Sequence, residues 1–548
     1  MNGPNPQAAR AYPPAISPPD SAASGNAIAF APAPEGPAVP LTGEVSEKSY
    51  GTILKSSALV GGSAVFNILF GIIRAKVMAL LLGAGGYGLL GIFSSIADLA
   101  RSVAGLGINS SGVRQIAEAV GSGDTRRIAC TVTTLRRVAL YSGATGALLL
   151  VAFCHPIAAF SFKSSDFTWQ VALLALVAFF GDISAAQSAL VQGMRRIADL
   201  AKLNVLGAFY GTVFSILIVW RWKEQGIVPA LICVAAMSIV SSWWYARKIK
   251  VEPVRIGAKE VFEEASELVK LGVAFMTSTL SVLAAGYLIR IILMRQIGAE
   301  AAGYYNAAWT AGTLYIGFIL QAMGADFFPR LTAVARRHDE CNRLVNEQSE
   351  VALLMAAPGI MGTLTYAPVL ITIFYSRDFG PAAPILQWLG LGMLIKVIAW
   401  PLGFIILAKG EKKIFFWSEV LTSAGYIGGV WFFVKWFGVV GAGIAFFALY
   451  VGYFAAVYLI ARRLTGFRFS PAARRIALIF LPLVAIVFAG LWFLPRWQGF
   501  ALGVAVTVAS GFYSMKTLSQ HVPMERLPRS AQKLFRLLGL RASNPIES

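Results

Sequence analysis

The chain has 548 residues, of which 57% are hydrophobic and only 14% charged, and its formal net charge is +20. This composition excludes an ordinary soluble globular protein, in which about a quarter of the residues are charged. Stretches of about 20 apolar residues recur along the chain, which is the length that a helix needs to cross a bilayer. The alternating ten-residue pattern of a membrane β-barrel does not occur in the sequence. The composition therefore predicts an all-α polytopic membrane protein.

The first segment, residues 1–50, is rich in proline, alanine, glycine and serine and shows no apolar period. A segment of this composition cannot bury enough apolar surface to fold, so we expect a disordered cytoplasmic tail. It also lacks a basic stretch followed by an apolar core, and we do not expect it to be a cleaved signal peptide.

Fourteen apolar ranges follow, and each is long enough to be a transmembrane helix. They are residues 57–82, 86–108, 134–154, 169–192, 203–220, 227–246, 271–294, 301–324, 350–374, 385–408, 414–436, 438–461, 476–494 and 498–516.

Basic residues gather in alternate loops. The loops after the even-numbered spans up to the twelfth carry at least three lysines and arginines each, whereas the other loops carry at most two. This alternation is the positive-inside rule, and it predicts that both termini are cytoplasmic. Because membrane topology accounts for the positive charge, nucleic acid is not an expected partner.

Two arginines lie deep inside apolar spans. Arg74 precedes Gly83 by 9 residues, and Arg290 precedes Gly298 by 8 residues. At 1.5 Å per residue, each arginine lies roughly 12–13 Å from the end of its span. A cation at this depth costs several kcal/mol unless it faces protein, water or an anion. The two arginines therefore predict a polar cavity between two lobes.

The positions of these residues indicate an internal repeat. Gly83 and Gly298 differ by 215 positions (298 − 83), as do Gly88 and Gly303 (303 − 88), whereas Arg74 and Arg290 differ by 216 (290 − 74) after a one-residue slip. Six spans separate the two copies, so both have the same orientation. We expect a parallel repeat about an axis along the membrane normal.

The repeat sets the expected domain boundaries: an N-lobe of six helices at 51–250, a C-lobe of six helices at 271–465 and an appended helix pair at 466–517. Residues 251–270 carry apolar residues at helical spacing and predict an interfacial linker helix on the cytoplasmic surface. Residues 518–548 form a basic cytoplasmic tail, which either lies on anionic lipid as a short amphipathic helix or is simply solvated.

Further charges within the spans are candidate cavity residues. Asp98 and Arg101 lie three residues apart on one helical face, where they either form a local ion pair or face the cavity. Lys396 precedes Pro401, which is expected to break or kink the helix, and a charge beside a helix break often marks a mid-membrane site. Glu419 in the next span is its expected partner, so Lys396 either lines the cavity or belongs to a structural pair.

A surplus of cations suits an anionic substrate, and guanidinium groups suit phosphate in particular. We therefore predict that Arg74, Arg290 and Lys396 bind the substrate. Asn67, Asp182 and Tyr287, with Asp98, Arg101 and Glu419, are candidates to contact sugars or carry coupling protons; each is equally consistent with packing or hydrogen bonding between helices.

We expect neither an enzyme nor a metal site. The loops on the extracytoplasmic side are at most about 15 residues long, and no set of acidic or histidine residues has the spacing of a catalytic centre. The four cysteines and three histidines are scattered without metal-binding spacing, and no cofactor is expected.

Four segments resemble a known family: residues 53–63 (ILKSSALVGGS), the GIIRAK segment at 71–76 with Leu81-Leu82-Gly83, residues 104–119 (AGLGINSSGVRQIAEA) and residues 400–410 (WPLGFIILAKG). They look like O-antigen translocases, the Wzx-type flippases of the polysaccharide transporter branch in the multidrug/oligosaccharidyl-lipid/polysaccharide exporter superfamily. The resemblance covers about residues 50–465. Members of this family often have twelve spans, and the fourteen expected here resemble the arrangement of the lipid II flippase.

The resemblance implies two six-helix lobes around a central cationic cavity in the bacterial inner (cytoplasmic) membrane. It also implies a substrate in which undecaprenyl diphosphate carries an oligosaccharide, such as an O-antigen, enterobacterial-common-antigen-like or exopolysaccharide repeat unit. Such a flippase works by alternating access, with an ion gradient as a possible driving force. Membrane lipids, a polysaccharide polymerase and a chain-length regulator are the implied partners.

Two alternatives stay open. A cation-coupled multidrug exporter of the same superfamily is expected to have mainly acidic cavity residues, whereas basic ones prevail here. A membrane scaffold for polysaccharide assembly that transports nothing is compatible with the same sequence.

Overall fold

The computed structural model describes residues 47–251, 254 and 257–521. All regular structure in this part of the chain is helical. The helices are α1 (Glu47–Ala104), α2 (Ile108–Ser122), α3 (Thr125–Ala152), α4 (Cys154–Phe162), α5 (Thr168–Gly193), α6 (Ile197–Trp222), η1 (Lys223–Gly226), α7 (Ile227–Ala246), α8 (Ala258–Gln296), α9 (Ala299–Ala333), α10 (His338–Phe374), η2 (Arg377–Phe379), α11 (Ala382–Ala408), α12 (Lys412–Phe437), η3 (Gly438–Val440), α13 (Gly441–Thr465), α14 (Pro471–Phe493) and α15 (Arg496–His521).

Each of the fourteen apolar ranges overlaps a helix. Within the described residues, nine helical segments are long and apolar enough to cross a membrane, and a tenth is added if the bent pair Ala299–Gln321 and Asp326–Ala333 is one span. Three of the nine cover two expected spans each, namely Gly62–Ala104, Ile197–Ala246 and Lys412–Thr465. The protein is therefore a multi-pass helical membrane protein. The tails expected at 1–50 and 518–548 lie almost wholly outside the described residues, apart from the first turn of α1 and the end of α15.

The expected turn between the first two spans is a sharp break inside α1. Gly83 has φ 66° and ψ −174°, which interrupts the helical geometry. The corresponding glycine, Gly298, has φ 138° and precedes α9. A positive φ is costly for residues with a side chain, so glycine at both positions lets the chain turn at the matching place in each half.

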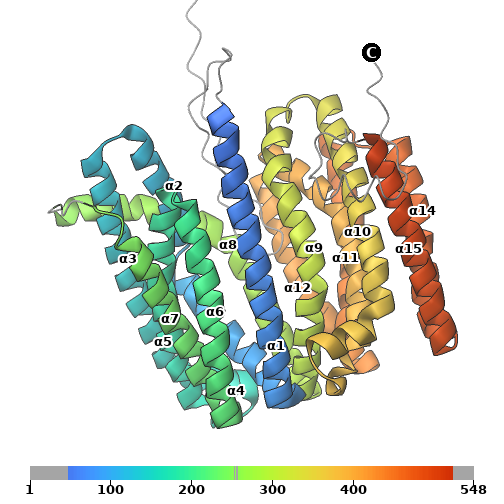
Figure 1. Cartoon of the computed structure of the whole chain (residues 1–548), viewed down its shortest axis with the longest axis horizontal. Coiled ribbons are helices and arrows are strands. Elements are labelled where there is room, and N and C mark those ends of the chain that lie inside the picture. The colour runs from blue at the N-terminus through green and yellow to red at the C-terminus, as the bar shows by residue number, and fades with distance from the viewer. Residues whose placement is uncertain (1–46, 252–253, 255–256, 522–548) are drawn as a thin grey trace, which may run out of the picture.

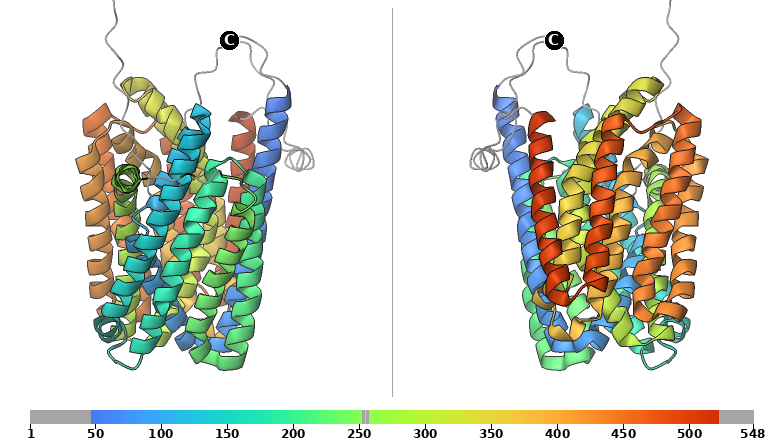
Figure 2. Two further views of the ribbon diagram at one scale, coloured as in Figure 1. Left: turned by 90° about the vertical axis from the view of Figure 1, so that its left-hand side faces the viewer. Right: turned by 90° about the vertical axis from the view of Figure 1, so that its right-hand side faces the viewer.

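The helices of the two halves lie on opposite sides of the molecule, and α1 and α9 lie side by side between them (Figure 1). The appended helices α14 and α15 pack on the outside of α10 at one edge, as the right-hand view of Figure 2 also shows. The start of α1 and the end of α15 lie at the same end of the bundle.

Residues 258–270 of the predicted linker are the first part of α8, whereas residues 252–253 and 255–256 lie outside the described residues. This part lies across the bundle in Figure 1 and is seen end-on in the left view of Figure 2. Leu268 is fully buried in an apolar cluster with residues of α2, α3 and α5, and the hydroxyl of Thr131 donates a hydrogen bond to Glu264 (2.5 Å). The linker is thus anchored to the first half before α8 turns into the bundle.

Candidate functional site

Two adjoining cavities lie at the junction of the halves. The first, of about 510 Å³, lies between α1, α6, α7, α9 and α10, and we call it the arginine chamber; its polar lining includes Asn67, Arg74, Arg290, Asn306 and Thr310. The second, of about 450 Å³, lies between α8, α9, α11, α12 and α13, and we call it the aromatic chamber; its lining includes Trp309, Lys396, Trp400, Glu419, Phe446 and Tyr450. Both volumes fall within the ~300–1,000 Å³ of small-molecule sites.

Ser95, Asp98 and Arg290 line both chambers, so the two cavities meet at these side chains. Asp98 and Ser95 come from the second part of α1, after the break at Gly83. Arg290 comes from the later part of α8, beyond the linker residues. The shared wall is therefore built from both halves of the chain.

Arg74 projects into the arginine chamber from α1. Its side chain is exposed, and within the described part of the chain no hydrogen bond or ion pair joins it to another residue. Since it is a permanently charged group with five donor N–H groups, it is available to an anion that enters the chamber.

Arg290 is held more firmly. Its Nε and Nη2 donate to Oδ1 of Asn306 at 3.3 and 2.9 Å, and its Nη1 donates to the carbonyl of Gly286 at 2.8 Å. These bonds use three of the five N–H donors of the guanidinium and leave two for a ligand. Asn306 lies two turns into α9, so the start of α9 fixes the direction of the Arg290 side chain.

The ion pair expected between Asp98 and Arg101 is present, with 3.0 Å between the carboxylate Oδ1 and Nη2. Asp98 reaches both chambers, whereas Arg101 points toward α5, where its side chain packs beside Gly181. Asp98 therefore has both of the roles that the sequence left open: it forms a local ion pair, and it lines the cavity.

Asp182 and Tyr287 are not among the described residues that line either chamber. Asp182 is only 5% exposed and packs beside Gly105 and Gly143, and its Oδ2 has no hydrogen-bond partner among the described residues. The hydroxyls of Tyr287 and Ser161 share a hydrogen bond of 2.7 Å, which ties α8 to α4. For Tyr287 the structure favours the role in interhelical hydrogen bonding.

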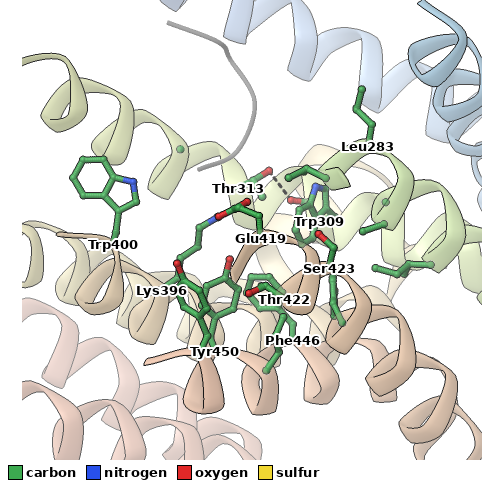
Figure 3. A pocket seen from close by; sticks show the side chains of 18 of the residues that line it. Leu283, Trp309, Thr313, Lys396, Trp400, Glu419, Thr422, Ser423, Phe446 and Tyr450 are labelled. Atoms are coloured by element: carbon green, nitrogen blue, oxygen red, sulfur yellow. Dashed lines mark hydrogen bonds between the residues drawn. The ribbon is translucent and has the colours of Figure 1, made fainter. Parts of the chain in front are cut away.

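Lys396 and Glu419 meet in the aromatic chamber, as expected. Figure 3 shows their side chains reaching toward each other from α11 and α12. Lys396 is only 5% exposed, and its Nζ lies 5.6 Å from the centre of the Tyr450 ring. Of the break or kink expected at Pro401, the break does not occur, because α11 continues through this residue to Ala408.

The sequence interpretation missed most of the tyrosines at this site. Tyr305 and Tyr426 share a hydrogen bond between their hydroxyls (3.1 Å), and Tyr450 and Tyr453 line the same chamber. Each tyrosine adds only one polar side-chain atom, its hydroxyl oxygen, to an apolar span. The composition of the span therefore does not distinguish it from a residue that only packs against its neighbours. The available signal was the concentration of tyrosine and tryptophan in the interiors of the spans that form α9, α12 and α13.

The fold is shared with solved transporters of low sequence identity. A structure titled "Lipid II flippase MurJ, inward closed conformation" matches with a TM-score of 0.61 at 14% identity and covers 85% of this chain and 98% of its own. An inward-facing multidrug resistance MATE family transporter matches with a TM-score of 0.61 at 15% identity and covers 73% of this chain and 95% of its own. The chain thus shares its fold with these two transporters.

Sequence comparison identifies the family within that class. Residues 77–384, more than half of the chain, match the family model described as "Polysaccharide biosynthesis protein", and the chain belongs to this family. The lipid III flippase of Escherichia coli is 22% identical over 417 residues, which cover 75% of this chain and 99% of the relative. A putative O-antigen transporter of Shigella flexneri is 24% identical over 372 residues, which cover 66% of this chain and 87% of the relative.

Proposed function

We propose that the protein is a flippase that moves an undecaprenyl-diphosphate-linked oligosaccharide, such as an O-antigen or related repeat unit, across the bacterial inner membrane. The family and the names of the relatives support this class of substrate. The names of these relatives also agree with the proposal that the protein is a transporter and not an enzyme.

The observation that carries the proposal is the pairing of Arg74 and Arg290 in one chamber. They come from α1 and α8, which hold corresponding places in the two copies of the predicted repeat. They face a single cavity with two guanidinium groups and one carboxylate, Asp98. Guanidinium groups bind phosphate oxygens with paired, charge-assisted hydrogen bonds. In this proposal the diphosphate lies between Arg74 and Arg290. Lys396 lines the other chamber, on the far side of Arg290, and its contact with the substrate stays a prediction.

The finer architecture belongs to the same proposal. Fourteen transmembrane helices form two six-helix lobes and an appended pair, and both termini are cytoplasmic. The glycan headgroup enters the chambers from the cytoplasmic side while the polyprenyl tail stays in lipid, and a rocking motion of the lobes opens the site to the other side. An ion gradient drives the cycle, and a polymerase and a chain-length regulator use the product.

Depletion of the protein in its source bacterium tests the function. Lipid-linked oligosaccharide is expected to accumulate on the cytoplasmic leaflet and to fall again when the wild-type gene is restored. A multidrug exporter predicts sensitivity to cationic compounds without this accumulation. Unchanged amounts of lipid-linked oligosaccharide in both leaflets would contradict the proposed function.

A further inference from the structure

We propose that the aromatic chamber is the subsite for the first sugars of the glycan, with Lys396 and Glu419 recognising their hydroxyls and Trp309 supporting a sugar ring. This inference rests on the proposed function and deepens it, because it divides the substrate between the two chambers.

The two chambers are connected at Arg290. Arg290 faces both cavities, and Asn306 and Gly286 hold its guanidinium in place. In the substrate, the first sugar is bonded directly to the diphosphate. A diphosphate held by Arg74 and Arg290 in the arginine chamber therefore places that sugar beside Arg290, where the aromatic chamber begins.

The charges of the two chambers differ in the way that this division requires. The arginine chamber has two cations, Arg74 and Arg290, and one carboxylate, Asp98. The aromatic chamber has two cations, Arg290 and Lys396, and two carboxylates, Asp98 and Glu419. An anion is favoured in the first chamber, whereas the second has no net charge and suits a polar, uncharged group such as a sugar.

The polar groups of the aromatic chamber are arranged for hydroxyls. Glu419 only accepts hydrogen bonds when ionised, and Lys396 only donates them, so side by side they match neighbouring hydroxyls that each donate and accept. Thr422 and Ser423 on α12 line the same wall and can do both (Figure 3). Because Lys396 is buried, an unmatched ligand group beside it is costly, which gives the contact its selectivity.

The aromatic lining supplies the complementary surface. Trp309 is half-buried, and its ring stacks with those of Tyr305 and Tyr426 at centroid distances of 6.0 and 6.4 Å, with Phe446 edge-on at 5.5 Å. These neighbours hold the indole in one orientation. The polarised C–H groups on the face of a sugar ring pack well against the electronegative face of such an aromatic ring.

Two ligands separate this inference from the proposed function. The probes are undecaprenyl diphosphate without sugar and the lipid-linked oligosaccharide extracted from source cells depleted of the protein. Their affinities for the full-length protein in detergent are measured by native mass spectrometry. Glu419→Gln and Trp309→Ala are the test variants, Arg74→Ala tests the diphosphate site, and Glu347→Gln, on an exposed surface pair, is the matched control.

Glu419→Gln and Trp309→Ala are each expected to weaken oligosaccharide binding by about tenfold and to change undecaprenyl diphosphate binding by less than about twofold. Retained binding of undecaprenyl diphosphate shows at the same time that a variant is folded. Equal losses for both ligands, or no loss for either, would overturn the glycan subsite while leaving the proposed function standing. If Arg74→Ala leaves both affinities unchanged, Arg74 does not bind the diphosphate, and the observation that carries the proposed function fails.

Discussion

Gly88 and Gly303 face each other where α1 meets α9, and a β-carbon on either one would overlap a backbone carbonyl of the opposite helix. The β-carbon of Gly88 would collide with the carbonyl of Ala299, and that of Gly303 with the carbonyl of Ala84. The relationship is reciprocal, because Gly303 and Ala299 lie 215 positions after Gly88 and Ala84. The contact lies just after the breaks at Gly83 and Gly298, at the end of the bundle opposite the start of α1 (Figure 1). It holds the two halves together at that end.

Enlarging one of these glycines is expected to open this end of the molecule. Gly88→Leu forces the helices apart. Overpacking of about 1–3 kcal/mol lowers the population of the arrangement in which α1 and α9 touch by roughly five- to a hundredfold. Spin labels at the exposed positions Leu80 and Ile297 report the distance between α1 and the start of the second half. The distance is expected to lengthen and transport to fall. Gly452→Leu, where a β-carbon meets nothing, is the control. An unchanged distance with full transport would show that the contact does not close the bundle.

Two substitutions of Asn306 are expected to affect the stability of the protein and its affinity for the anion to different extents. Asn306→Asp keeps an acceptor for Arg290 and adds a negative charge beside it, so the protein stays folded while undecaprenyl diphosphate binds about tenfold more weakly. Asn306→Ala removes the acceptor and is expected to lower the thermal stability more but the affinity less. Asn109→Asp adds the same charge at an exposed position. If Asn306→Asp binds undecaprenyl diphosphate as tightly as the wild type, Arg290 does not contact the diphosphate.

The appended helices are expected to depend on one polar junction with α10. The Ser470 hydroxyl accepts a hydrogen bond from the Ala473 N–H (2.9 Å) at the start of α14 and donates to Glu350 (2.6 Å). Asn346 accepts from the backbone N–H of Ser470 at 2.8 Å and donates to the carbonyl of Arg468 at 3.1 Å.

Ser470→Ala is expected to cost about 1 kcal/mol through loss of the cap. Asn346→Ala is expected to cost about 1 kcal/mol or more, because it leaves two partly buried backbone groups without their partner. Thermal unfolding and proteolysis between α13 and α14 measure the effect. Ser418→Ala removes a hydroxyl whose one hydrogen bond to a described residue is with the carbonyl of Phe415 in its own helix, and it is expected to change little. If all three variants are as stable as the wild type, packing on α10 and lipid contacts hold α14 and α15 in place without this polar junction.

Much of this arrangement follows from sequence patterns that depend on one helix at a time. The apolar ranges overlap the helices, and the glycines at 83 and 298 both adopt positive φ. The matching depth of Arg74 and Arg290 predicted a common cavity, and both line the arginine chamber. The spacing of Asp98 and Arg101 indicated a local ion pair as one of two alternatives, because residues three apart lie on one face of a helix, and this pair is present.

Features that depend on how helices rotate against their neighbours could not be predicted in the same way. Asp182 is a charge in an apolar span, like Arg74, yet it lies packed beside Gly105 and Gly143 rather than in a chamber. The division of the cavity at Arg290 depends on the hydrogen bond between α8 and α9 through Asn306. The spacing of residues along one segment predicts neither the direction in which Asp182 points nor the contact between Arg290 and Asn306.

The most direct measurement of the central claim is headgroup translocation in proteoliposomes that contain the full-length protein and extracted lipid-linked oligosaccharide. Arg74→Ala and Arg290→Ala are compared with the wild type and with Arg343→Ala, which removes an exposed arginine of a surface pair and is expected to retain transport. Each of the first two variants is expected to insert normally and to lose at least about tenfold in rate, because each loses a charge-assisted contact with the diphosphate. Wild-type rates in both variants would contradict the assignment of the arginine chamber to the diphosphate.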